Sequence, residues 1–374
     1  MSQTKQEEQM ATSASYVNGT IGELIYRGYD IRDLGPNATY EEVVYLLWYD
    51  KLPNRDELND FRQKLNAKRT LPDLILNLLR ELPRGSQPMA VLRTAVSALA
   101  LTDPTADDVT LEGAREKALL LTAVLPTIIA AWERLRNGKE PIAPRDDLRA
   151  AENLLYMLDG KQPDPDAVAA LDSYLVMLAD HGFNASTFSA RVTISTGADV
   201  YSAVTSAIGT LKGPAHGGAT QRAMEQFISA KENGNTEEWY RNARAAGKRI
   251  MGIGHRIYKV EDPRAKILRP LAERFAKNSG SSQWFDIATE IEQLTRQDEY
   301  FIERDLYANV DYYSAVVLYT IGLPTDQFTC IFASSRIAGW CTQILEQLAD
   351  NRLIRPKESY VGKREQKYVP LADR

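Results

Sequence analysis

The sequence has few residues of the kinds that cross-link a chain or hold a metal. Its 374 residues include only two cysteines and three histidines. Cys330 and Cys341 both lie in an apolar, helix-like stretch near the C-terminus, where free cysteine usually behaves as a small buried side chain. We therefore expect no disulfide scaffold.

An excess of positive charge is also lacking. Acidic residues outnumber basic ones, 50 to 45, so no overall positive field is available to hold a nucleic acid or an anionic membrane surface. We expect neither a nucleic acid nor a membrane among the partners. An anionic ligand would have to be bound locally, by arginines gathered in a cleft.

Hydrophobic runs are short. The longest, residues 118–132, is below the roughly 20 residues that span a bilayer, and Pro126 interrupts it. We interpret this run as a buried helix or helix pair. The first ten residues are polar and acidic, unlike a signal peptide, so we expect a cytoplasmic protein.

The hydrophobic content, 44%, is sufficient for a globular enzyme with one large and one smaller domain. Asn18-Gly19 lies between two β-like runs, residues 14–17 and 20–26, and predicts a hairpin with positive φ at its turn. Thr39 and Glu42 have the spacing of a helix capping box. Helical spacing of apolar residues then recurs to the end of the chain, at 43–48, 71–82, 90–101, 167–178, 268–275 and 337–348. The predicted fold is all-α apart from the hairpin.

The three histidines each stand beside glycine, as His181, His216 and His255. A single histidine is more often structural than functional, but glycine lets a ligand or backbone approach closely. Three histidines in this setting favour imidazoles that face an open cleft. A zinc site is the remote alternative, because the sequence has no His-Glu-x-x-His or Cys-x-x-Cys pattern, and we predict no metal.

The segment around His255, Gly252 to Lys259 followed by Asp262-Pro263-Arg264, resembles the signature of the citrate synthase family. Further segments agree with that family in order and spacing, so the resemblance covers nearly the whole chain: 26–31, 211–218, 309–311, Ser335-Arg336 and Arg355-Pro356. The resemblance implies a two-domain helical fold with a short N-terminal β-hairpin. It places residues 1–218 and 317–374 in a large helical domain and 219–316 in a small one.

The family reaction condenses acetyl-CoA with oxaloacetate to give citrate and free CoA. It requires a base to remove a weakly acidic C–H proton and hydrogen-bond donors to two developing oxyanions. The resemblance implies that Asp311 is the base, that His216 serves the thioester oxygen and that His255 serves the ketone oxygen. From sequence alone, Asp311 could instead be the N-cap of the following helix. His216 precedes a probable helix, whose N-terminus would favour a neutral imidazole.

The remaining site residues are also implied by the resemblance. Oxaloacetate has two carboxylates, and arginine grips a carboxylate with two parallel hydrogen bonds. The expected oxaloacetate ligands are His181, Arg264, Arg336 and Arg355, the last contributed by the second subunit of a homodimer, with higher assembly possible. Coenzyme A enters as a co-substrate, and no permanently bound cofactor is implied. Its expected contacts are Arg249, Ile250, Met251, Gly252, Ile253, Gly254, Lys259 and Asn309.

Two other functions fit the same motifs. A 2-methylcitrate synthase would use propionyl-CoA, and one methylene changes pocket preference by only about 1 to 3 kcal/mol. A non-catalytic acyl-CoA or dicarboxylate sensor could retain the fold. Intact His216, His255 and Asp311 favour an enzyme over a sensor.

Overall fold

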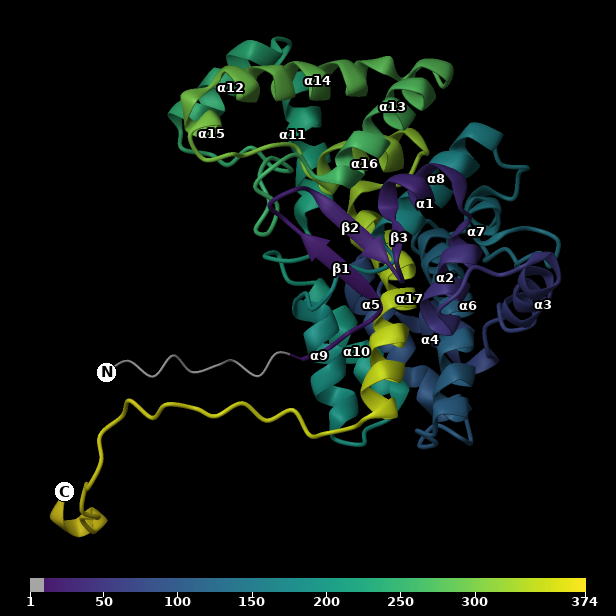
Figure 1. Ribbon diagram of the computed structural model, residues 1–374, viewed down its shortest axis with the longest axis vertical. Coiled ribbons are helices and arrows are strands. Elements are labelled where there is room, and N and C mark those ends of the chain that lie inside the picture. Colours follow the sequence, from purple (N-terminus) through teal and green to yellow (C-terminus); the bar gives the residue numbers. More distant parts are fainter. Residues whose placement is uncertain (1–9) are drawn as a thin grey trace.

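The computed structural model describes residues 10–374, and helices make up most of it (Figure 1). The first helices are α1 (Ile31–Asn37), α2 (Tyr40–Tyr49), α3 (Arg55–Asn66), α4 (Asp73–Glu81), α5 (Pro88–Leu99), α6 (Leu111–Arg136), α7 (Ala150–Asp159), α8 (Pro165–Leu178), α9 (Ala185–Ser195) and α10 (Val200–Leu211). They are followed by α11 (Ala219–Asn233), α12 (Thr236–Ala245), α13 (Pro263–Asn278), α14 (Ser282–Gln297), α15 (Glu299–Ile302), α16 (Val310–Thr320) and α17 (Phe328–Ala349). Short 3₁₀ turns cover Ala100–Thr102, Thr325–Gln327 and Leu371–Asp373. The predicted all-α class is confirmed.

The predicted hairpin is present, but its turn differs from the prediction. Strands β1 (Ser15–Asn18) and β2 (Glu23–Tyr26) are antiparallel and pair Asn18 with Glu23, so residues 19–22 form the turn. Gly19 does not have a positive φ, whereas Gly22 does, at 66°. A two-residue Asn-Gly turn was therefore the wrong expectation. The short strand β3 (Tyr29–Asp30) adds a third strand in the order β1-β2-β3.

Helix starts follow their capping residues. Thr39 and Glu42 form the predicted capping box at α2, with hydrogen bonds in both directions between side chain and backbone. Asp262 caps α13, and its side chain accepts a hydrogen bond from the Arg264 N–H. The cap of α13 thus fixes an arginine that the sequence placed in the site.

Helix α6 is a single helix that passes through Pro126, so the alternative of a helix pair is wrong. A proline inside a helix costs about 3 kcal/mol. Its neighbours Leu125 and Ile128 are buried, and each such side chain contributes about 1.5–3 kcal/mol, which offsets the lost hydrogen bond. Among residues 10–374, α6 alone has the length and hydropathy to cross a membrane, yet 72% of that window is buried inside the protein, as in a core helix.

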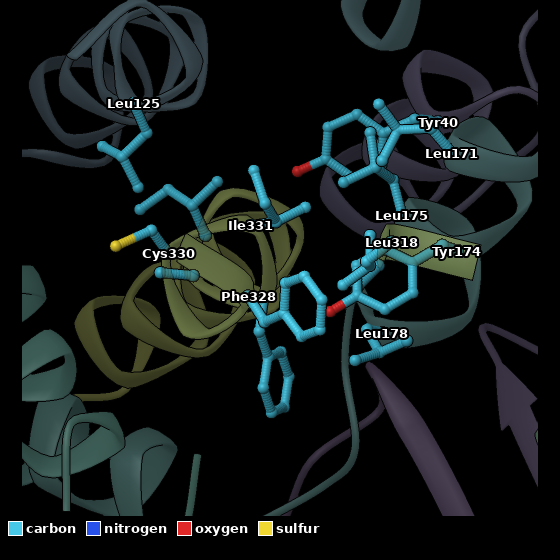
Figure 2. Close-up of a cluster of buried hydrophobic side chains, with 14 of the residues drawn as sticks. Tyr40, Leu125, Leu171, Tyr174, Leu175, Leu178, Leu318, Phe328, Cys330 and Ile331 are labelled. Atoms are coloured by element: carbon cyan, nitrogen blue, oxygen red, sulfur yellow. The ribbon is translucent and has the colours of Figure 1, made fainter. Parts of the chain in front are cut away.

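The core is centred on α17, which packs against α6, α8 and α9. Figure 2 shows Leu171, Tyr174, Leu175 and Leu178 of α8 facing Phe328 and Ile331 of α17. Both cysteines are buried and unpaired in α17, as expected.

Helices α11 to α16 gather at one end of the molecule, away from α3, α4 and α6 (Figure 1). The hairpin lies between this group and the rest, and its tip reaches the loop that follows His255. The proposed division into domains, 1–218 with 317–374 and 219–316, stays a prediction, and its first nine residues lie outside the described part of the chain.

Candidate active site

The segment before His255 is held in place by the segment before α16. Ile253 forms a β-bridge with Ala308, and the Asn309 Nδ2 donates to the Gly254 carbonyl at 2.7 Å. Gly252 has a φ of 79°, and a Cβ there would lie 2.9 Å from the Tyr312 ring, so both backbone and packing require glycine. This pairing brings His255 toward Asp311, although the two are distant in sequence.

Backbone hydrogen bonds assign the tautomer of His255. Its Nδ1 accepts from the N–H groups of Ile257, at 3.1 Å, and Tyr258, at 3.2 Å. A ring nitrogen that accepts carries no proton in the neutral imidazole, so the proton is on Nε2. His255 therefore presents an N–H donor.

His181 lies beside His255. Their ring centroids are 5.6 Å apart, and the His181 Nε2 is 3.1 Å from the Tyr258 hydroxyl. Burial, followed by the positive charge of Arg264, lowers the pKa of His181 well below its usual value. His181 is thus a neutral, buried group on the wall of the same site.

Arg264 is fixed by a bidentate ion pair with Asp262. Its Nε and Nη2 donate to the two carboxylate oxygens at 3.0 and 2.8 Å, and both side chains are buried. Asp262 Oδ2 also accepts from the Val310 N–H at 3.2 Å, at the start of α16. The pKa of Asp262 is lowered by Arg264, against the effect of burial. One carboxylate therefore orients Arg264 and anchors the helix that holds Asp311.

Arg336 is a buried cation that no carboxylate of the described residues contacts within ion-pair distance. Its side chain is 2% exposed, its Nε donates to the Leu178 carbonyl at 2.6 Å, and it forms no ion pair within residues 10–374. Burial lowers its pKa, as expected for a desolvated cation. An unpaired buried charge is costly, so this position is suited to an anionic ligand.

His216 is held by Ser186 at the start of α9. The Ser186 N–H donates to the His216 Nε2 at 3.3 Å, and the Ser186 hydroxyl is 2.8 Å from the same nitrogen. Nε2 is therefore the acceptor, and the ring proton is on Nδ1. Trp340 Nε1 donates to the Ser186 hydroxyl at 3.1 Å and fixes it in turn.

Asp311 is not the N-cap of α16, so the capping alternative for this residue is wrong. The cap is Asn309, whose Oδ1 accepts from the Asp311 N–H at 2.9 Å. The Asp311 carboxylate instead accepts from the Thr220 hydroxyl in the first turn of α11. Burial raises its pKa, while that hydrogen bond and Arg264 oppose the shift. A carboxylate that is partly desolvated and free of capping is suited to act as a base.

The two catalytic candidates His216 and His255 are neutral at physiological pH. Burial lowers the pKa of each to about 4, aided by Arg336 for His216 and by Arg264 for His255. Helix α11 begins at Ala219 with Gly218 as its cap, so His216 precedes the helix. Desolvation is the main cause of the lowered pKa of His216, and the positive charge of Arg336 is the second.

The predicted coenzyme segment runs along the edge of this site. Ile250 and Ile253 are buried, so they offer backbone groups and not side chains to a ligand. The Met251 N–H donates to the Gln226 Oε1 at 2.9 Å, and the Gln226 Nε2 donates to the Met251 carbonyl at 2.8 Å. Arg249 and Lys259 are exposed, as are Lys248 and Arg256. None of these four cations forms an ion pair within the described residues, which leaves them open to an anionic ligand.

Arg355 is the one predicted site residue that lies apart from the others. It is exposed, and it belongs to the segment after α17 that runs away from the body of the molecule (Figure 1). The single chain therefore assembles His181, His216, His255, Arg264, Arg336, Asn309 and Asp311 without it.

Sequence reasoning missed the residues that hold the catalytic candidates. Ser186 contacts His216, Thr220 contacts Asp311, and Trp340 holds the Ser186 hydroxyl. None of the three lies in a motif that the sequence analysis identified. Asp262 and Tyr258 fell within the signature segment and were given no role. Only Asp262 carried a usable signal, because an Asp-Pro pair before a helical run is a typical N-cap.

A separate cavity of about 600 Å³ lies between the ends of α6, α7, α13 and α16, and it contains none of the site residues.

Within residues 10–374, no group of three or more His, Cys, Asp or Glu side chains could hold a metal ion.

A buried carboxylate, two neutral imidazoles that each keep one N–H, and buried arginines are the groups that an enzyme forming and stabilising an enolate requires. The family model for the citrate synthase C-terminal domain matches residues 5–357. Citrate synthase from Haloferax volcanii is 45% identical over 96% of this chain and 95% of its own length, and citrate synthase 2 from Bacillus subtilis is 43% identical over the whole of both chains. The 2-methylcitrate synthase of Mycobacterium tuberculosis is 40% identical over 96% of this chain and 89% of its own.

A solved structure agrees with the sequence comparisons. The citrate synthase of Thermoplasma acidophilum, in a ternary complex with carboxymethyl coenzyme A and oxaloacetate, superimposes with a TM-score of 0.91 at 33% identity, covering 99% of this chain and 98% of that one. The chain belongs to the citrate synthase family. It is an acyltransferase of that type.

Proposed function

We propose that this protein condenses acetyl-CoA with oxaloacetate, giving citrate and free CoA. The observation that carries this proposal is the Asp311 carboxylate in one site with two neutral imidazoles and with Arg336, which forms no ion pair among residues 10–374. The Thermoplasma acidophilum structure, solved with a coenzyme A analogue and oxaloacetate, supports both substrates.

Oxaloacetate would bind against the buried arginines. Arg336 offers a buried positive charge that forms no ion pair within residues 10–374 and is opposed only by the more distant Asp180 carboxylate. Arg264, oriented by its ion pair with Asp262, adds a second guanidinium. The Nε2–H of His255 would donate to the ketone oxygen and draw electrons from the carbon under attack. His181 lines the same wall as a neutral hydrogen-bonding group.

Acetyl-CoA would be activated by Asp311 and His216. The Asp311 carboxylate takes a proton from the methyl group, and the Nδ1–H of His216 donates to the thioester oxygen as negative charge develops there. The enolate carbon then forms a bond to the ketone carbon of oxaloacetate. Water hydrolyses the resulting thioester, giving citrate and the free thiol of CoA.

Substitutions at these two positions test the assignment. We expect Asp311→Asn and His216→Ala each to lower kcat by several orders of magnitude, with the fold intact, because each removes a group that acts in the transition state. Free thiol release from acetyl-CoA, with and without oxaloacetate, measures the rate. The exposed Asp107→Asn serves as a control and should retain wild-type turnover. Near wild-type turnover in Asp311→Asn would remove this residue from the mechanism.

Propionyl-CoA is the second candidate acyl donor, supported by the relative named 2-methylcitrate synthase. Side-by-side kcat/KM values for acetyl-CoA and propionyl-CoA distinguish the two. A ratio above ten in favour of propionyl-CoA would overturn the choice of acetyl-CoA. Absence of thiol release from either acyl-CoA, with oxaloacetate present, would instead indicate a sensor.

We further propose a homodimer in which Arg355 reaches the partner's oxaloacetate site. This proposal is supported by the exposed position of Arg355 on a segment that leaves the body of its own chain (Figure 1). We also propose that residues 219–316 move as a small domain and exclude water when they close on the large one.

A further inference from the structure

We propose that the tip of the N-terminal hairpin, residues 19–22, is a positioning element for His255. It would hold the loop after His255 in the one backbone geometry that places the ring proton on Nε2. The inference rests on the proposed role of His255 as a donor to the ketone, and it assigns a function to a segment that touches no substrate.

The hairpin tip meets this loop through backbone atoms. The Lys259 N–H donates to the Gly19 carbonyl at 2.9 Å. A Cβ on Gly19 would lie 2.1 Å from the Ile257 carbonyl oxygen and 2.6 Å from its carbonyl carbon, distances that real Cβ atoms do not show. Because the obstructing atoms are backbone, they cannot rotate aside. Any side chain at position 19 must therefore displace residues 257–259 or the hairpin.

The same loop determines the protonation of His255. The N–H groups of Ile257 and Tyr258 both donate to the His255 Nδ1. These two donors keep Nδ1 unprotonated and leave the proton on Nε2, where the proposed chemistry needs it. A shift of the 257–259 backbone removes the donors and releases the ring to rotate or change tautomer.

The base of the hairpin is anchored beside His181. The Tyr26 hydroxyl donates to the Asp180 carbonyl at 2.8 Å, and the Ser15 hydroxyl accepts from the Gly182 N–H at 3.0 Å. The hairpin therefore ties the segment of one site histidine to the loop of another. Since residues 15–26 and 255–259 fall in different predicted domains, the Gly19–Lys259 contact also depends on how the two domains lie.

Gly19→Ala tests the proposal, with Gly85→Ala as a matched control, because Gly85 has no positive φ and a Cβ added to it would have no atom within 4 Å. We expect Gly19→Ala to raise the KM for oxaloacetate at least tenfold, with a smaller change in the KM for acetyl-CoA. Circular dichroism should show that Gly19→Ala and Gly85→Ala are both folded at the assay temperature. ¹⁵N NMR of the His255 ring should show protonated Nε2 in the wild type and a tautomer mixture in Gly19→Ala.

A milder variant covers the case in which Gly19→Ala does not fold. Asn18→Ala removes the Asn18 Oδ1 acceptor of the Thr20 N–H at the exposed turn and introduces no clash. We expect it to raise the KM for oxaloacetate two- to fivefold. Wild-type KM values and an unchanged His255 tautomer in Gly19→Ala would overturn the proposal, as would an unchanged KM in Asn18→Ala if Gly19→Ala is unfolded. Failure of the proposed function is separate, because the wild type itself would then release no thiol.

Discussion

At the scale of single residues, the site depends on imidazoles that stay uncharged. A neutral His216 and a neutral His255 each have one N–H, and the protein fixes which nitrogen carries it through Ser186 and the 257–258 backbone. In an imidazolium both ring nitrogens carry a proton, so neither nitrogen would be left as an acceptor. Burial keeps each imidazole neutral, and hydrogen bonds from the protein then determine which of its two nitrogens carries the proton.

The lowered histidine pKa values predict how stability depends on pH. Folding lowers the pKa of His216 from about 6.5 to about 4, so between these values the unfolded chain binds more protons than the folded one. The free energy of unfolding should therefore fall as the pH drops from 6.5 to 4, by up to about 1.4 kcal/mol per pH unit for each such histidine.

Denaturant unfolding of wild type and His216→Gln across this range checks the prediction, because glutamine does not titrate. The slope of the variant should be shallower below pH 6.5, and the two curves should run parallel above pH 7. Equal slopes between pH 4 and 6.5 would show that His216 is not desolvated in the folded protein.

At the scale of elements, one side chain at the start of α16, Asn309, both caps the helix and holds the predicted coenzyme segment. Asn309 caps the helix through Oδ1 and holds the Gly254 carbonyl through Nδ2. The same helix start is bound by Asp262 at Val310. Asp311, the proposed base, is therefore fixed relative to the predicted coenzyme segment through Asn309 and relative to the start of α13 through Asp262.

Substitution of Asn309 should separate these roles. Serine is also a good N-cap, so Asn309→Ser should be more stable than Asn309→Ala by about 0.5–2 kcal/mol in free energy of unfolding. Both variants lose the bond to Gly254, so both should raise the KM for acetyl-CoA several-fold. A wild-type KM in Asn309→Ser would show that this bond does not shape the coenzyme site.

At the scale of the whole molecule, the proposed contribution of Arg355 to a partner site predicts complementation between two inactive variants. In a mixed dimer of Asp311→Asn and Arg355→Ala chains, the site containing wild-type Asp311 would receive wild-type Arg355 from its partner. Mixing equal amounts and allowing exchange should restore about a quarter of wild-type activity, because half of the dimers are mixed and each has one intact site.

Two controls accompany this experiment. Each variant alone should remain inactive after the same exchange treatment. Sedimentation should confirm that both variants assemble as the wild type does. Absence of any recovery in mixed dimers would place Arg355 in its own chain's site or outside the site altogether.

The sequence predicted the helical class and about half of the helix positions, because local propensity and apolar spacing act over a few residues. It was wrong where distant contacts decide the local structure. Gly19 was expected to have the positive φ of a two-residue turn, whereas it lies in a longer turn and allows the close approach of Ile257. Asp311 was a plausible cap until Asn309 was seen in that place. Pro126 suggested a break in a helix that burial keeps continuous.

What the sequence alone determined is the family motifs and hence the candidate reactive groups, since His216, His255 and Asp311 stand in motifs that can be recognised without coordinates. Only the tertiary structure decided which imidazole nitrogen carries the proton, and that Arg336 is buried with no ion pair among residues 10–374. The physical reason is that protonation and charge depend on donors, acceptors and burial supplied by residues far away in the chain. Ser186, Thr220 and the hairpin tip reach the site only after folding.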